Sequence, residues 1–139
     1  LQLRSFNATH GLPSGCKNVI RANNRLYFAT ESGLVKPTPD GNRFVPDPSL
    51  GSTFSDASRG ILLLRDDPRG HLWISGAGYH GTLRNPGQPN AEWLPMPLLG
   101  AGLEDVWVTH TDPDGVVWAA GPDGRLVRFD PSLGAPRPP

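Results

Sequence analysis

The sequence predicts an all-β fold made of three repeated units, and two observations support this. One short phrase, an apolar residue followed by an aromatic and then a small or apolar residue, occurs at Leu26-Tyr27-Phe28, Leu72-Trp73-Ile74 and Val117-Trp118-Ala119. Its aromatic residues are 46 and 45 residues apart, and a near-constant period of this length is typical of repeat arrays. The 17 glycines and 16 prolines punctuate short apolar runs, as the turns of an all-β protein do.

Aligning the units on the aromatic residue gives each the same order of short strands. We therefore predict a segment of a β-propeller with about three four-stranded blades and no helix. A lone unit of this size cannot bury a core, so the units must stack. The expected organisation is three propeller repeats over residues 1–130, with an outer strand at 1–6, units at 18–46, 61–95 and 106–130, and a Pro-rich tail at 131–139.

The first two strands of each unit are expected to form a tight antiparallel hairpin. The turns between them contain Asn, Asp, Pro and Gly, which favour turn conformations and bond their own backbone. The predicted first strands are 18–22, 61–65 and 106–110, the turns 22–25, 66–70 and 111–115, and the second strands 26–30, 71–75 and 116–120.

A third strand follows in every unit, but the last unit has no fourth strand of its own. The predicted third strands are 34–36, 82–84 and 125–129, and the fourth strands are 43–45 and 92–94. Residues 1–6 stand where a fourth strand would precede the first unit. In a closed ring, such an outer strand can complete the last blade and tie the two ends together.

The first unit resembles the two-component regulator propeller repeat in its GLPS phrase at residues 11–14 and its LYFATESGL run at residues 26–34. The second unit keeps Asp66, Gly70 and residues 72–76 of this pattern, and the third keeps Asp112, Gly115 and residues 117–120. Neither later unit has the GLPS phrase, and the second lacks the Gly-Leu pair. Related propeller repeats, such as those of streptogramin lyases, share a DxxGxxW phrase and an ending similar to RFDP at residues 128–131.

This resemblance implies a ligand-sensing, non-catalytic part of a bacterial signal-transduction receptor. Members of the family usually form the periplasmic or otherwise extracytoplasmic sensor of membrane-anchored histidine kinases, hybrid regulators or cyclic-nucleotide synthases. Three units leave an open sheet edge at each end, and open edges favour pairing with another chain. The ring is therefore expected to be completed by further blades of a longer parent chain or by a second copy in a homo-oligomer.

Composition narrows the classes of partner. Lys and Arg together number 13, as do Asp and Glu, so no basic field is available for nucleic acid. The single Cys16 cannot form an intramolecular disulfide, which leaves the compartment open. The apolar stretches, such as residues 61–64, are too short to insert into a membrane. No signal pattern begins the sequence, so the protein is expected to be cytoplasmic or to have lost a targeting segment.

The candidate ligand-binding face follows from a geometry common to propellers, in which the loops that join successive blades and the loops between second and third strands share one end of the ring. Polar groups with a few aromatics suit a sugar or another polar small molecule, although a solvated loop face explains the same residues. The loop at residues 76–81 departs from the repeat, so Tyr79 and His80 are its expected centre. The full set is Tyr79, His80, Glu31, His10, Arg59, Asp56, Glu104, Asp105 and Asp123.

The repeated aromatics are expected to pack between blades, because they occupy one register position and bury large areas. Trp107 and His110, on the predicted innermost strand of the third unit, are candidates for lining the central channel.

No cofactor or metal is predicted. The histidines have no zinc-binding spacing, and the turn at residues 112–115 lacks the later oxygen ligands of a calcium loop. No nucleophile or phosphate-binding motif is present. Two alternatives to ligand sensing remain, namely a structural or protein-interaction propeller, and a lyase-like or lactonase-like enzyme. The enzyme would require His80, His110 and Glu31 to converge.

Overall fold

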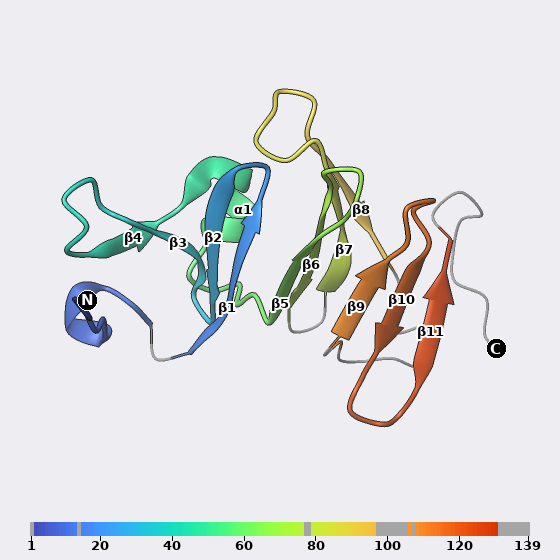
Figure 1. Ribbon diagram of the computed structural model, residues 1–139, viewed down its shortest axis with the longest axis horizontal. Helices are drawn as coiled ribbons and strands as arrows, with labels where there is room; N and C mark the ends of the chain where they lie inside the picture. Colours follow the sequence, from blue (N-terminus) through green and yellow to red (C-terminus); the bar gives the residue numbers. More distant parts are fainter. Residues whose placement is uncertain (1, 14, 77–78, 97–105, 107, 131–139) are drawn as a thin grey trace.

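The chain is an all-β protein of three antiparallel sheets, which follow one another in sequence order (Figure 1). The computed structural model describes residues 2–13, 15–76, 79–96, 106 and 108–130. The first sheet contains β1 (Cys16–Ala22), β2 (Arg25–Thr30), β3 (Gly33–Pro37) and β4 (Phe44–Pro46). The second contains β5 (Leu63–Asp66), β6 (Leu72–Gly76), β7 (Tyr79–Arg84) and β8 (Glu92–Pro95), and the third β9 (Val108–Thr111), β10 (Val117–Ala120) and β11 (Leu126–Phe129).

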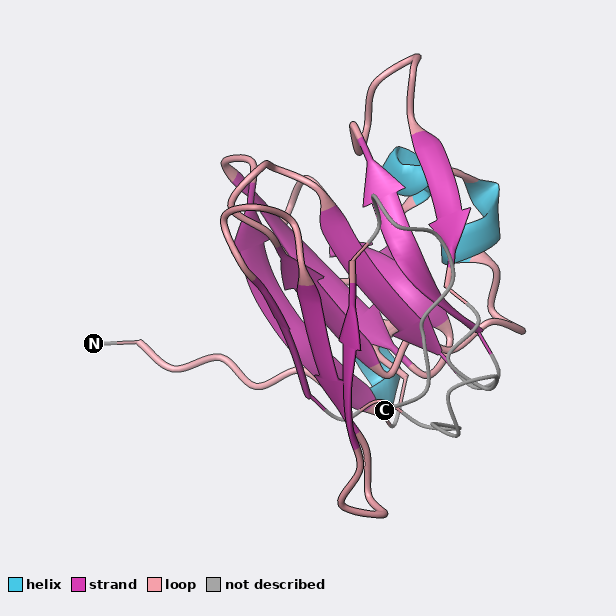
Figure 2. Cartoon of the chain, turned by 90° about the vertical axis from the view of Figure 1, so that its right-hand side faces the viewer, coloured by secondary structure: helices cyan, strands magenta, loops and turns pink. Residues whose placement is uncertain are grey.

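The three sheets lie side by side in the manner of propeller blades, with the first strand of each nearest its neighbours. β1 contacts β5, and β5 contacts β9. A hydrogen bond from the Leu64 backbone N–H to Asn18 Oδ1, at 3.0 Å, joins β5 to β1. Seen from the third sheet, the strands of successive sheets stack behind one another (Figure 2). The predicted order of strands within each unit is confirmed in the described part of the chain.

The sheets are held together by two apolar clusters, one at each junction. Because side chains alternate between the faces of a strand, one face of a sheet meets the preceding sheet and the other meets the following one. At the first junction, Tyr27, Ala29 and Leu34 pack with Leu72 and Ile74.

At the second junction, Leu63, Trp73 and Met96 pack with Val117, Ala119, Val127 and Phe129. Each of the first two repeats thus directs its aromatic, Tyr27 or Trp73, toward the following sheet. The expected packing of these two residues between blades is confirmed.

The hairpins between first and second strands have the predicted tight turns. Asn23 and Asn24 both have positive φ, 52° and 62°, as a two-residue type I′ turn requires. In the later units the turn ends at Gly70 or Gly115, with φ of 81° and 89°, which glycine adopts without a steric penalty. Each of these glycines donates its N–H to the carbonyl of the Asp that begins the turn.

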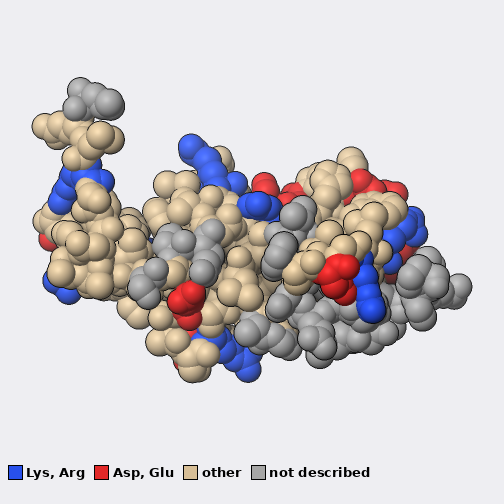
Figure 3. Space-filling model, turned by 90° about the horizontal axis from the view of Figure 1, so that it is seen from below, with Lys and Arg blue, Asp and Glu red and all other residues tan. Residues whose placement is uncertain are grey.

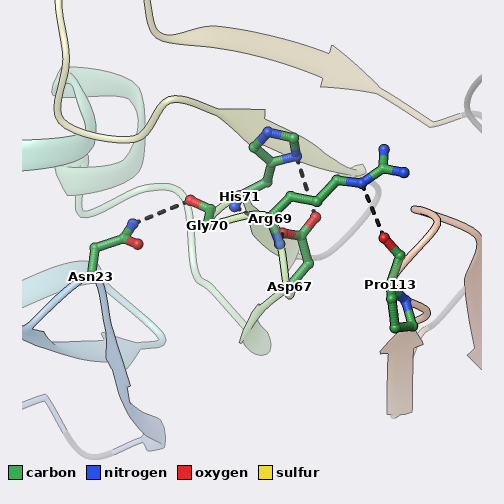
Figure 4. Close-up of polar contacts among 6 residues, drawn as sticks. All are labelled: Asn23, Asp67, Arg69, Gly70, His71 and Pro113. Atoms are coloured by element: carbon green, nitrogen blue, oxygen red, sulfur yellow. Dashed lines mark hydrogen bonds and ion pairs between the residues drawn. The ribbon is translucent and has the colours of Figure 1, made fainter.

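Successive hairpins are also bonded to each other (Figure 4). Asn23 Nδ2 donates to the Gly70 carbonyl at 3.2 Å, and Arg69 Nε donates to the Pro113 carbonyl at 3.3 Å. Asp67 orders the middle turn, since its Oδ1 accepts from the backbone N–H groups of Arg69 and His71. The same end of each sheet is therefore tied to the next one.

The expected outer strand at residues 1–6 is not formed by the described residues of this single chain. Residues 2–7 form no strand; instead the Phe6 ring packs edge-on against Phe44, with centroids 5.4 Å apart, and Arg4 Nη2 donates to Asn42 Oδ1 at 2.7 Å. The physical reason is distance, because this segment lies beside β4, at the opposite end of the row from β11 (Figure 1). The expected tail at residues 131–139 lies outside the described residues.

The prediction that no helix would form is also wrong. A short 3-10 turn, η1 (Ala8–His10), precedes β1, and η2 (Pro48–Leu50) and α1 (Ser52–Ser55) connect the first two sheets. Their side chains Leu50 and Phe54 are buried in the first cluster. These segments are too short to show a helical period in the sequence; burial of Leu50 and Phe54 holds η2 and α1 in place.

Candidate functional site

Three segments that are distant in sequence converge around Gly60. The Ile61 N–H donates to the Thr30 carbonyl at 2.9 Å, which brings the linker at residues 56–60 to the turn between β2 and β3. A methyl group on Gly60 would lie 2.8 Å from the Glu31 carbonyl oxygen, so the two backbones are in close contact. From the second sheet, the Tyr79 hydroxyl donates to the Gly60 carbonyl at 3.0 Å. We call Glu31, Asp56, Arg59 and Tyr79 the Gly60 cluster.

Arg59 provides the cation of the Gly60 cluster. Its guanidinium carbon lies 5.8 Å from the centroid of the Tyr79 ring, within the range of a cation–π interaction. Arg59 is exposed while Tyr79 is half-buried, so the guanidinium retains donors that face water. Burial raises the pKa of Tyr79, and the nearby positive charge of Arg59 partly opposes this shift. Tyr79 is therefore a neutral hydrogen-bond donor at ordinary pH.

Asp56 provides a fixed negative charge in the same loop. Its Oδ1 accepts hydrogen bonds from the backbone N–H and the hydroxyl of Ser58, both at 2.8 Å. These bonds, followed by the charge of Arg59, hold the pKa of Asp56 below its usual value. Glu31 is likewise exposed, and its side chain extends over Gly15. The Gly60 cluster thus combines carboxylates, a guanidinium and the ring of a tyrosine at one end of the first two sheets.

Tyr79 and His80 do not lie in a loop, contrary to the sequence prediction. Both belong to β7, where Tyr79 pairs with Gly76 and His80 pairs with Ser75. The glycines that indicated a loop instead allow close packing, because a methyl group on Gly76 would collide with the Tyr79 ring. His80 is buried and lies on the face of Ser75 and Trp73, away from the Gly60 cluster.

Two other predicted site residues have local roles. The backbone N–H of Asn7 donates to His10 Nδ1 at 3.1 Å, and the His10 ring packs against Phe6, so His10 caps η1. Asp123 forms an ion pair with Arg125, 3.1 Å from Oδ2 to Nε, in the third sheet. Glu104, Asp105 and Trp107 lie outside the described residues.

The structure does not bring together the three residues that an enzyme would need. His80 shares the face of the second sheet that packs on the third. His110 pairs with Trp118 and so lies on the far face of the third sheet, where its Nε2 is 3.2 Å from Asp112 Oδ1. The third sheet therefore stands between His80 and His110, and Glu31 belongs to the first sheet.

Sequence reasoning missed a second polar group, on the outward face of the third sheet. Trp118 Nε1 donates to Asp112 Oδ2 at 3.2 Å, and the Arg128 guanidinium carbon lies 5.8 Å from the Trp118 ring centroid. Alternation places Trp118 on the face opposite to Val117 and Ala119, but the sequence alone does not indicate which of the two faces enters the core.

Charge and metal-binding groups are dispersed. Lys and Arg side chains alternate with Asp and Glu side chains over the face drawn in Figure 3. No group of three metal-ligating side chains occurs among the described residues. Within that same part of the chain, no helix is long and apolar enough to cross a membrane.

No family model matches the chain, and no curated protein matches its sequence.

Proposed function

We propose that this chain is the ligand-recognition part of a bacterial signal-transduction receptor, and that it binds a polar small molecule or an oligosaccharide without catalysing a reaction. The observation that carries the proposal is the Gly60 cluster, in which Arg59 of the linker stacks on Tyr79 of the second sheet, with Glu31 and Asp56 supplying carboxylates. Its extracytoplasmic location and its signalling role rest on the resemblance to the two-component regulator propeller repeat.

The chemistry of the cluster suits a ligand rich in hydroxyl groups. Carboxylates of Glu31 and Asp56 accept hydrogen bonds from hydroxyls, the guanidinium of Arg59 donates to ring or carboxylate oxygens, and the ring of Tyr79 offers an apolar surface for stacking. Because the segments are joined by backbone hydrogen bonds, the site is largely formed before the ligand arrives. Binding then costs little ordering of the protein.

A glycan array and a binding screen of small polar metabolites test this function, with calorimetric titration of any ligand found. We expect Arg59→Ala to weaken binding at least about tenfold, which corresponds to ~1.4 kcal/mol. Arg43→Ala is the matched control, because Arg43 is also exposed but lies next to β4, away from the Gly60 cluster. The affinity of this variant for the ligand should equal that of the wild type. Equal affinity of wild type and Arg59→Ala for every ligand found, or no ligand among glycans and small polar metabolites, would reject the assignment.

One specific observation favours a second candidate, a structural or protein-interaction propeller. Large apolar side chains are exposed on the outward faces of the first and third sheets. For the third candidate, a lyase-like or lactonase-like enzyme, the separation of His80 from His110 offers no support.

A further inference from the structure

The two outward faces of the row of sheets expose apolar side chains. On the first sheet Val19 and Leu26 are 51% and 52% exposed, and on the third sheet Leu126 is 60% exposed. We call the outward face of the first sheet the rear face and that of the third sheet the front face.

The register of the strands assigns the residues of the rear face. Tyr27 and Ala29 point into the first junction, so Leu26 and Phe28 point away from it. Val19 is directly opposite Phe28 and therefore shares its face. The rear face thus contains Val19, Leu26 and Phe28.

The same reasoning assigns the front face. Val117 and Ala119 point into the second junction, so Trp118 and Ala120 point away from it. Leu126 is directly opposite Ala120 and lies on the same face. Trp118 and Ala120 are half-buried within one chain, which leaves their surface available to a further layer.

Both faces repeat the pattern of junctions that the chain already contains. Leu26 and Phe28 occupy the repeat positions of Leu72 and Ile74, which pack on the preceding sheet. Trp118 occupies the repeat position of Trp73, which packs on the following sheet. The rear and front faces are therefore two halves of the kind of interface that the molecule forms twice internally.

We propose that the rear face of one chain binds the front face of a second copy. Because each copy carries both halves, a twofold arrangement forms the contact twice and closes a ring of six sheets. This proposal concerns assembly and does not depend on the Gly60 cluster or its ligand.

Light scattering during size-exclusion chromatography, with sedimentation equilibrium, tests the assembly. We expect wild type to have twice the mass of the 15.0 kDa chain. Leu126→Asp on the front face and Leu26→Asp on the rear face should each weaken the dimer by about 30-fold per contact, the effect of a central interface residue. Each substitution acts at both contacts of the ring, so the total should approach about 1,000-fold.

Val45→Asp is the matched control. Val45 is 37% exposed on β4. It pairs with Lys36, and each of these two residues is next in sequence to a residue of the rear face, Phe44 and Val35 respectively. It belongs to neither outward face, so the variant should remain a dimer. Should Leu26→Asp unfold, as judged by circular dichroism, Val19→Asp tests the same face.

Mixing the two variants distinguishes head-to-tail assembly from other dimers. A mixture of Leu126→Asp and Leu26→Asp retains one intact contact, between the unaltered front face of one and the unaltered rear face of the other. We expect the mixture to associate more tightly than either variant alone, because every contact in a homodimer of one variant contains a substitution, whereas the mixed dimer keeps one contact at full strength. A monomeric wild type, open-ended longer oligomers, a dimer that survives either substitution, or a mixture that stays monomeric would each overturn the proposal.

Discussion

Asp47 has no exposed surface, yet it carries a carboxylate between the first sheet and the linker. Both its oxygens accept from Arg25 Nη2, at 2.9 and 2.8 Å, and Oδ1 also accepts the Ser49 N–H at the start of η2. The guanidinium continues over the Tyr27 ring, 5.5 Å from its centroid. One ion pair thus fixes the linker that leads to the Gly60 cluster.

We expect Arg25→Ala to lower the free energy of unfolding by about 3 kcal/mol, because it leaves a buried carboxylate without its cation. This is the low end for buried pairs, since the Arg25 side chain is 42% exposed. Arg25→Ala with Asp47→Ala should cost less than the sum of the single substitutions. Urea denaturation measures all three, and additive effects would show that the pair is not coupled.

At the scale of elements, the sequence predicts what is local. Turn chemistry at Asn23-Asn24 and around Gly70 and Gly115 determines the hairpins, and alternation determines which residues enter the junctions. The predicted strand at residues 1–6 is not formed, because a strand needs a neighbouring strand to bond with, and its expected neighbour belongs to another blade. The predicted loop at residues 79–80 is wrong for a related reason. Gly76 suggests a loop in the sequence, but in the structure it pairs with Tyr79 within the sheet.

The turns between second and third strands contain two glycines with the same backbone conformation but different surroundings. Gly33 has φ of 82° and Gly124 has φ of 76°. A methyl group on Gly33 would lie 2.7 Å from the Phe54 carbonyl oxygen, whereas nothing lies within 4 Å of one on Gly124.

We expect Gly124→Ala to lower the free energy of unfolding by about 1 kcal/mol, which is the cost of holding alanine at a positive φ. Gly33→Ala should cost clearly more, because the linker carrying α1 must move away. Chemical denaturation of both variants provides the comparison, and equal losses would contradict a close approach of this linker to the first sheet.

At the scale of the whole molecule, the sequence predicts the candidate site only in part. Arg59, Asp56, Glu31 and Tyr79 were expected on one face, and they come together because two sheets and a linker meet at Gly60. His10 and Asp123 were expected there too, but each has a partner in its own segment. Which sheet face a polar residue occupies depends on the junctions, and these join residues far apart in sequence.

The two junctions differ in how completely they exclude water. At the first junction, Ala29, Leu34 and Leu72 have no exposed surface. At the second junction, the most buried residues, Trp73 and Ala119, are still 2% exposed. In a stacked array, each sheet is stabilised chiefly by its direct neighbours. The third sheet has one such neighbour in the described part of a single chain, whereas the second has one on each side.

We therefore expect the third sheet to open most readily. Native-state hydrogen exchange read by mass spectrometry should show faster exchange in β10 than in β6, with a smaller opening free energy. The Leu26→Asp variant is the appropriate sample, because loss of the proposed second copy leaves the front face uncovered. In wild type the same β10 amides should be slowed, since the rear face of the partner covers Trp118. Equal protection of β6 and β10 in the variant would mean that the three sheets unfold as one unit, and the second junction would then be as strong as the first.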